Sequence, residues 1–293
     1  MSDHDAMAWT LTHDLTNFLA TAGDFLHSRP VEHTVLLSST ETLRIRGPHV
    51  FGDAQPLFGW WCEGDGAVTG VFMHTPPFPL YLSPMPTTAV PAVIEALDRH
   101  GHSFSEAIAD QHTIDRFTAA WRDKTGATYR VTKHLRLHRL DTLTPPTPAP
   151  PGRARLADEA DQALLVEWYD AFCRETGEPS ASANLVSDRL SFGGLMLWEV
   201  DGVPVSMAGR NRSIAGVIRI APVYTPPQLR GRGYAGGVTA ALSQAALDSG
   251  AEVILFTDVA NPTSNALYQR LGYRPLGDVI TVSLGSGAQT DSD

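Results

Sequence analysis

The fold class of this chain can be read first from the run Val223-Tyr-Thr-Pro-Pro-Gln-Leu-Arg-Gly-Arg-Gly-Tyr-Ala235. A strand is expected to end at the start of this run, and a helix begins near Tyr234 after a loop that holds Gly231 and Gly233. The first N–H groups of a helix have no partner within the helix and lie at the positive end of its macrodipole. Glycines let the backbone approach an anion closely. The run therefore predicts a site for a phosphate-bearing ligand, a feature that several unrelated families share.

A second informative block is Asn261-Pro-Thr-Ser-Asn-Ala-Leu-Tyr-Gln-Arg-Leu-Gly-Tyr273, which follows an apolar strand predicted at Val253–Val259. A short helix is expected within this block, because Leu267 and Leu271 then face one way. Another helix is predicted at Tyr234–Ser249, between the two blocks. The order of strand, glycine loop, helix, strand and helix indicates a mixed α/β fold.

Together, the two blocks resemble the coenzyme A-binding motifs of the GCN5-related N-acetyltransferase (GNAT) family. The family's spacing Gln-x-x-Gly-x-Gly/Ala is matched by Gln228, Gly231 and Gly233. The second block resembles the family's asparagine, helix and tyrosine, followed by a Leu-Gly-Tyr/Phe turn. The motifs cover residues 216–275, and the element order extends the resemblance to residues 153–284. The resemblance implies an α/β fold with a mixed sheet of the acyl-CoA N-acyltransferase type.

The resemblance also implies where acetyl-coenzyme A binds as a co-substrate. In this family the fourth and fifth strands splay apart, and the pantetheine arm lies between them on main-chain groups of the fourth. The acyl group passes directly from the thioester to an amine, so no protein nucleophile is required. The implied cofactor-binding residues are Val223, Tyr224, Thr225, Gln228, Arg230, Gly231, Arg232, Gly233, Tyr234, Ala235, Asn261 and Asn265. For Asn261 a main-chain bond is the alternative, and for Asn265 a solvated position on the helix.

Tyr268 is the predicted general acid, because it occupies the place where many family members keep a tyrosine that protonates the leaving thiolate. Free thiols have a pKa of about 8.5 and tyrosine one of about 10, so the hydroxyl is a reasonably matched proton donor. The alternative is a core tyrosine whose hydroxyl is satisfied by hydrogen bonds.

The sequence does not assign the general base. An alkyl ammonium group must lose a proton before its nitrogen can attack. All 11 histidines precede residue 142, so an imidazole is excluded from the predicted C-terminal domain. Some relatives place a glutamate on the fourth strand, but the strand at Gly216–Tyr224 carries no carboxylate. The candidates that stay open are Glu167, Glu175, Glu178, Glu199, and Tyr224 acting through water.

A proline-rich run at residues 144–152 divides the chain into two predicted domains. Proline fixes φ and donates no hydrogen bond, so an extended, semi-rigid spacer is expected there. The predicted division is residues 1–141, a degenerate GNAT-like domain; 142–152, a linker; 153–285, the acetyltransferase domain; and 286–293, a disordered tail.

The N-terminal half repeats the element order loosely. An ancient duplication would produce this, and two unrelated α/β domains of similar size are the alternative. Its loop at Ser83–Pro91 has neither Gly-x-Gly nor arginine, so this half is not expected to hold coenzyme A. Its last two strands, Thr128–Lys133 and Leu135–Leu140, are expected to pair with each other. The last strand of the C-terminal domain is expected at Val279–Leu284.

The composition excludes several classes of function. A net charge of −10 argues against nucleic-acid binding, which needs a basic face for the phosphates. No apolar run is long enough to span a bilayer, and the acidic N-terminus lacks the basic region of a signal peptide, so we expect a cytoplasmic protein without membrane contact. Cys62 and Cys173 have no disulfide or metal-ligand spacing, and the close histidine pairs are weak metal signals, so no metal is expected.

The sequence therefore predicts an N-acetyltransferase that moves the acetyl group of acetyl-coenzyme A directly to a primary amine of a small molecule or peptide. The alternatives are a transferase for a longer acyl group and a non-catalytic coenzyme A-binding or regulatory module. Small amines, amino acids, aminoglycoside-like antibiotics and protein N-termini all stay open as acceptors. A homodimer is compatible with the sequence, which does not determine the oligomeric state.

Overall fold

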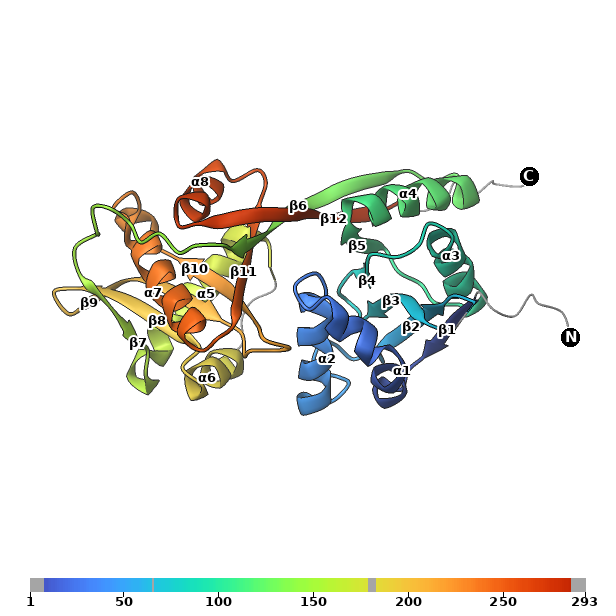
Figure 1. Ribbon diagram of the computed structural model, residues 1–293, viewed down its shortest axis with the longest axis horizontal. Helices are drawn as coiled ribbons and strands as arrows, with labels where there is room; N and C mark the ends of the chain where they lie inside the picture. Colours follow the sequence, from blue (N-terminus) through green and yellow to red (C-terminus); the bar gives the residue numbers. More distant parts are fainter. Residues whose placement is uncertain (1–7, 65, 179–182, 286–293) are drawn as a thin grey trace, which may run out of the picture. The chain divides into compact units, whose positions relative to one another are not determined.

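The chain forms two units in the computed structural model, which describes residues 8–64, 66–178 and 183–285. Unit 1 comprises residues 1–136 and 277–293, and unit 2 comprises residues 137–276. Each unit has its own hydrophobic core, and Figure 1 shows the course of the chain through both. The tail at residues 286–293, predicted to be disordered, lies outside the described residues. In the described part of the chain, no helix is both long enough and apolar enough to cross a bilayer.

Unit 1 contains a mixed sheet with the strand order β1-β2-β3-β4-β5-β12-β6. The strands are β1 (Ala8–Thr12), β2 (Leu57–Cys62), β3 (Val68–His74), β4 (Leu80–Leu82), β5 (Glu106–Asp110), the first part of β6 (Tyr129–Leu140) and the last part of β12 (Tyr273–Leu284). The helices are α1 (Leu15–Ser28), α2 (Thr34–Arg46), α3 (Ala89–Arg99) and α4 (Gln111–Thr125). Strands β4 and β5 are parallel, and α3 supplies the crossover that a parallel pair requires.

The C-terminal part of β12 completes the sheet of unit 1. It pairs antiparallel with β5, where Ile280 lies opposite Ala109. Ile280 and Val282 are 4% and 1% exposed and pack in the core of unit 1. The predicted division needs correction here, because it placed the strand Val279–Leu284 in the second domain. Alternation of apolar residues identifies a strand, but it does not say which sheet the strand joins.

Strand β6 is continuous from Tyr129 to Leu140, so the predicted pairing of Thr128–Lys133 with Leu135–Leu140 is wrong. A tight hairpin needs residues such as Gly, Asn or Asp that adopt positive φ, and none separates the two halves of this strand. The strand contributes residues up to Arg136 to unit 1 and residues from Leu137 onward to unit 2.

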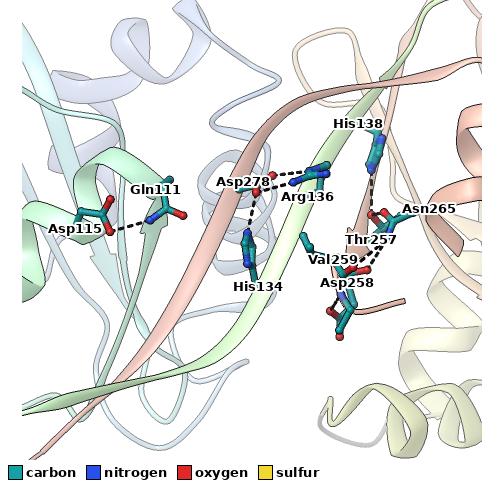
Figure 2. Close-up of polar contacts among 11 residues, drawn as sticks. Gln111, Asp115, His134, Arg136, His138, Thr257, Asp258, Val259, Asn265 and Asp278 are labelled. Carbon is teal, nitrogen blue, oxygen red and sulfur yellow. Dashed lines mark hydrogen bonds and ion pairs between the residues drawn. The ribbon is translucent and has the colours of Figure 1, made fainter. Parts of the chain in front are cut away.

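Asp278 joins β12 to β6 within unit 1. Its carboxylate accepts hydrogen bonds from Nε and Nη2 of Arg136 at 2.7 and 2.9 Å, and it lies 2.8 Å from Nε2 of His134 (Figure 2). The hydrogen bonds from the Arg136 guanidinium lower the pKa of Asp278 to about 2. The folded state of unit 1 therefore stabilises the ionised form of Asp278.

Replacing Asp278 by Asn is expected to lower the free energy of unfolding at pH 7 by about 1 kcal/mol, since solvent partly screens the ion pairs. Because the folded-state pKa is depressed, the carboxylate stabilises the fold above its unfolded pKa of about 4. That contribution is lost as the pH falls toward about 2. Urea unfolding should show a difference in the free energy of unfolding between the wild type and Asp278→Asn at pH 7. This difference should become smaller through this acid range. A difference that is independent of pH would contradict the role given to the ion pairs.

In unit 2 the strand order is β12-β6-β11-β10-β9-β8-β7, and the strand pairing is again mixed. Its strands, beside parts of β6 and β12, are β7 (Arg153–Leu156), β8 (Leu195–Val200), β9 (Val203–Arg210), β10 (Val217–Tyr224) and β11 (Glu252–Asp258). Its helices are α5 (Gln162–Thr176), α6 (Ala183–Ser191), α7 (Tyr234–Asp248) and α8 (Pro262–Arg270), with 3-10 turns η1 (Glu159–Asp161) and η2 (Pro227–Leu229). Residues of β9 alternate between two cores, because Ala208 packs with α7 and Met207 packs with α5 and α6. The predicted mixed α/β fold is confirmed.

The proline-rich segment at residues 141–152 packs within unit 2 and is not a spacer between the units. A Cβ atom built on Gly236 of α7 would lie 3.3 Å from Cγ of Pro146, and one on Gly237 would lie 2.9 Å from Cγ of Pro150. Trp198 donates from Nε1 to the carbonyl of Pro151 at 2.8 Å. The predicted linker therefore needs correction. The stiffness of proline was recognised, but its apolar rings also cover the small-residue face of α7.

Candidate functional site

Strands β10 and β11 part from each other midway along their lengths. Both strands lie wholly within the described residues, and their parallel pairing ends with Arg219 opposite Ile254. Beyond that point β10 keeps its pairing with β9, although the register shifts between Ile220 and Val223. Within these described strands, the main-chain groups of β10 that face β11 beyond Arg219 are therefore not paired with β11. They can bind a ligand. The predicted contact residues 223–225 lie at this opening.

The glycine loop opens α7 with the geometry of an anion-binding site. Gly231 and Gly233 adopt φ values of 76° and 84°. This is the left-handed region, which costs other residues about 1–2 kcal/mol. The first helical hydrogen bond runs from the N–H of Gly237 to the carbonyl of Gly233 at 3.0 Å. The N–H groups of residues 234–236 thus precede the first helical bond, and the N-cap glycine has no side chain to bind them.

The two arginines of the loop differ in their partners. Arg230 donates from Nη2 to both carboxylate oxygens of Glu175 at 2.7 Å, and from Nε to the carbonyl of Thr225 at 2.8 Å. Arg232 is exposed, and its Nη2 lies 3.4 Å from the carbonyl of Gln228. Arg232 is therefore the more accessible cation, whereas Arg230 must exchange Glu175 for a phosphate in order to bind one.

Replacing Glu175 by Gln is expected to tighten the binding of acetyl-coenzyme A by about two- to fivefold at low salt, because the neutral amide competes less for Arg230. The gain in affinity should be no larger than this, because both side chains of the ion pair are 46% exposed and solvent screens their attraction. Calorimetric titration at two salt concentrations measures the dissociation constant. Glu252→Gln, which disrupts another exposed ion pair of unit 2, is the control and should leave binding unchanged. Identical affinity in both variants would show that Arg230 does not take part.

Tyr268 lies on α8 and is 8% exposed. Its ring packs edge-on against Tyr273, with the ring centroids 5.9 Å apart. Burial raises the pKa of the Tyr268 hydroxyl above its usual value. The hydroxyl therefore keeps its proton through neutral and moderately alkaline pH, as a donor must, although burial also makes it a weaker acid. Its assignment as the general acid stays a prediction.

Asn261 and Asn265 both bind the turn between β11 and α8. Asn261 is the N-cap of α8, and its Oδ1 accepts from the N–H of Ser264 at 3.0 Å. Asn265 donates from Nδ2 to the carbonyls of Asn261 and Asp258 at 2.8 and 2.9 Å. Main-chain bonding, one of the two interpretations of Asn261, is thus observed, and Asn265 is held by the same turn.

His138 was not among the predicted site residues, and the predicted absence of an imidazole from the C-terminal domain is wrong. His138 lies on β6 in unit 2 and is 0% exposed. Its Nε2 lies 3.0 Å from Oγ1 of Thr257 on β11 (Figure 2). The predicted boundary after residue 141 assigned this histidine to the other domain. No local pattern marks it, because only the neighbouring positions of β6 and β11 in the sheet bring it here.

The groups considered as general bases differ in their surroundings. Glu199 is buried and accepts from Nε of Arg155 at 2.5 Å, while Glu175 is bound by the loop arginine described above. Burial raises the pKa of Tyr224, which disfavours its ionised form. Glu167 and Glu178 are exposed, as is Glu175.

The corresponding loop of unit 1, between β4 and α3, differs from the glycine loop of unit 2. Pro84 and Pro86 have no N–H to donate. Oγ of Ser83 accepts from the N–H of Val71 at 2.9 Å, which ties the loop to β3. The N-cap Thr88 has right-handed backbone angles. The loop thus lacks the left-handed glycines that expose main-chain donors at the start of α7.

The histidines of unit 1 include one close pair. Nδ1 of His74 lies 2.6 Å from Nε2 of His102, so one ring donates to the other. Burial lowers the pKa of His74 to about 4, which keeps its ring neutral at physiological pH. Among the residues that the structure describes, no group of three or more His, Cys, Asp or Glu side chains is placed to hold a metal ion.

Several known proteins are similar to this chain in sequence or in fold. The family model described as FR47-like protein matches residues 207–280. A GNAT-family acetyltransferase from Colwellia psychrerythraea has a TM-score of 0.63 at 12% identity, covering 95% of this chain and 99% of that chain. A GCN5-related N-acetyltransferase from Sphaerobacter thermophilus has a TM-score of 0.58 at 17% identity, covering 94% of each chain. A tandem GNAT protein from the clavulanic acid biosynthesis pathway has a TM-score of 0.54 at 11% identity, covering 97% and 100%.

These similarities define the fold as that of the GNAT acyltransferases, with two units in tandem. No curated protein matches the sequence. The FR47-like match spans the glycine loop, α7 and α8, and it confirms the family resemblance that the two sequence blocks indicate. At these low identities the solved structures establish the fold, and together with the family match they support a general acyltransferase function.

Proposed function

We propose that this protein is an N-acetyltransferase that moves the acetyl group of acetyl-coenzyme A to a primary amine. The observation that carries the proposal is the opening between β10 and β11, which is followed directly by the glycine loop at the start of α7. An extended thioester with a pyrophosphate group needs both features. The opening offers main-chain partners for amide groups, and the helix start offers N–H donors for phosphate oxygens.

Within this site the residues of the chain have separate tasks. The N–H groups of the loop and the exposed Arg232 would hold the pyrophosphate, and the main chain of residues 223–225 would hold the pantetheine amides. The bound thioester supplies an activated acyl group. Transfer forms the C–N bond and breaks the C–S bond, so the amine loses a proton and the leaving sulfur gains one. Tyr268 would donate the proton to that sulfur, while the proton from the amine passes to water or to a base of the site.

The acceptor we propose is a primary amine of a small molecule or a peptide. A screen of amines with acetyl-coenzyme A, which detects the released thiol with a thiol-reactive dye, tests this. We expect thiol release that requires both the amine and the enzyme. Faster release from a longer acyl donor would favour the longer-acyl alternative. Acetyl-coenzyme A that binds without thiol release, with every amine and acyl donor, would contradict catalysis and leave the non-catalytic binding module.

A further inference from the structure

A chain of three hydrogen-bonded polar side chains, two of them buried, links β6, β11 and α8 in unit 2. Nε2 of His138 lies 3.0 Å from Oγ1 of Thr257, and the same oxygen lies 2.6 Å from Oδ1 of Asn265 (Figure 2). His138 and Thr257 are buried, and Asn265 lies in the first part of α8. The chain therefore runs from the interior of the sheet to the start of the helix that carries Tyr268.

The donor and acceptor of each hydrogen bond in this series follow from the orientation of the Asn265 amide. Nδ2 of Asn265 lies 2.8, 2.9 and 3.4 Å from the carbonyls of Asn261, Asp258 and Val259, which fixes the amide orientation. Oδ1 of Asn265 is then an acceptor, so the single hydroxyl hydrogen of Thr257 points to it. The oxygen of Thr257 must accept from His138, and Nε2 of His138 therefore carries a hydrogen.

We propose that His138, Thr257 and Asn265 form a positioning chain that fixes the turn at residues 258–261 and, through α8, the placement of Tyr268. Asn265 and Tyr268 are three residues apart, so they share one side of α8. A shift of the Asn265 end would therefore move the Tyr268 hydroxyl with it. This inference rests on the proposed function, since it concerns the geometry of the proposed acid.

The same hydrogen-bond directions exclude Nε2 of His138 as the general base, and the other ring nitrogen, Nδ1, is buried. Its Nε2 already donates to Thr257, and the hydroxyl hydrogen of Thr257 is committed to Asn265. A proton taken from an amine could not reach Nε2 of His138 through these hydrogen bonds, because each donor in the series points away from His138 toward the turn. The hydrogen-bonded chain can orient groups, but it offers no route by which a proton from a substrate could reach Nε2.

Substitutions that keep volume but remove one hydrogen bond test the proposal. Thr257→Val, or His138→Leu, should lower kcat by about tenfold, since small displacements of a catalytic group have effects of this size. The dissociation constant for acetyl-coenzyme A should change less than about twofold. His138→Gln keeps a donor near the Nε2 position and should recover most of the turnover. Thr239→Val is the matched control: this hydroxyl is also buried in unit 2, without a hydrogen-bond partner among the described residues, and kcat should not change.

Two measurements without turnover separate this inference from the proposed function. In the wild type, nitrogen NMR of the His138 ring should show the hydrogen on Nε2. Hydrogen exchange of the amides of Asn261 and of residues 263–265 should quicken in Thr257→Val and not in Thr239→Val. Unchanged exchange, a hydrogen on Nδ1 alone, or wild-type kcat in Thr257→Val would overturn the positioning chain. An inactive wild type with the expected exchange result would refute the proposed function while the turn-fixing role stands.

Discussion

Replacing Gly233 by Asp is expected to weaken the binding of acetyl-coenzyme A at least about a hundredfold, or about 3 kcal/mol. The new carboxylate would stand at the N-cap of α7, where it repels the pyrophosphate and accepts the N–H groups that the ligand needs. The fold should tolerate the change, because Asp is a favourable N-cap residue and adopts positive φ more readily than most. Calorimetry on the purified variant, with circular dichroism to show that it is folded, gives the result.

Two controls isolate the charge from the backbone strain at this position. Gly233→Ala has the same strain from a φ of 84° but adds no carboxylate, so it should bind more tightly than the Asp variant. Gly250→Asp introduces the same side chain just beyond the other end of α7, at a φ of 79°, and should leave binding near the wild-type value. A folded Gly233→Asp variant with wild-type affinity would refute the anion site at the start of α7.

Replacing Tyr268 by Phe is expected to lower turnover with a good amine at least about tenfold, because general-acid assistance is typically worth about 10²–10⁴ in rate. The affinity for acetyl-coenzyme A should stay nearly constant, since the hydroxyl acts mainly as the thioester breaks. The decrease in turnover should be smaller for acyl donors whose leaving thiol is more acidic, because such a thiolate needs less protonation. Steady-state kinetics under conditions where chemistry limits the rate measure this effect.

Tyr273→Phe is the matched control for this experiment. Tyr273 is fully buried, contacts the ring of Tyr268, and its hydroxyl lies 2.7 Å from Oγ of Ser243. Its loss should lower the free energy of unfolding by about 1–3 kcal/mol and leave turnover unchanged. Wild-type turnover in Tyr268→Phe would mean that Tyr268 is a packing residue, which was the alternative from the sequence.

Local patterns predicted most elements of unit 2, because these elements were marked by their own residues. The hairpin between β8 and β9 turns at Asp201-Gly202, a dipeptide typical of tight turns, and both residues adopt positive φ, at 51° and 78°. Asp158 caps the 3-10 turn η1, where its side chain accepts from the N–H of Ala160 at 2.9 Å, and Asp161 is the N-cap of α5. The left-handed glycines and the start of α7 followed from the spacing of the glycine loop.

Elements without such markers were not predicted. The helix α2 buries Thr34 and Thr40 together with leucines, so its inward face is only partly apolar and its periodicity is weak. The helix α6 was missed as well, and Val186 is its buried residue. Both helices owe their positions to tertiary packing, which a single sequence does not display.

Long-range pairing was the other limit of sequence reasoning. The alternation in β12 and β6 identified strands, but it could not show that each strand contributes residues to both units. This single omission moved the domain boundary, and it placed His138 in the wrong half of the protein. The partners of Arg230 and Asn265 were unpredictable for the same reason, because Glu175 and Thr257 come from other elements.

Calorimetric titration of the wild-type chain with acetyl-coenzyme A tests the central claim most directly, since it reports affinity and stoichiometry together. Unit 2 has the opening between β10 and β11 and the left-handed glycines at the start of α7, whereas the loop of unit 1 has prolines at the equivalent place. We therefore predict saturable binding with one molecule per chain. A stoichiometry of two would show that unit 1 also binds the ligand, and a titration without any binding heat or competition would contradict the proposed site altogether.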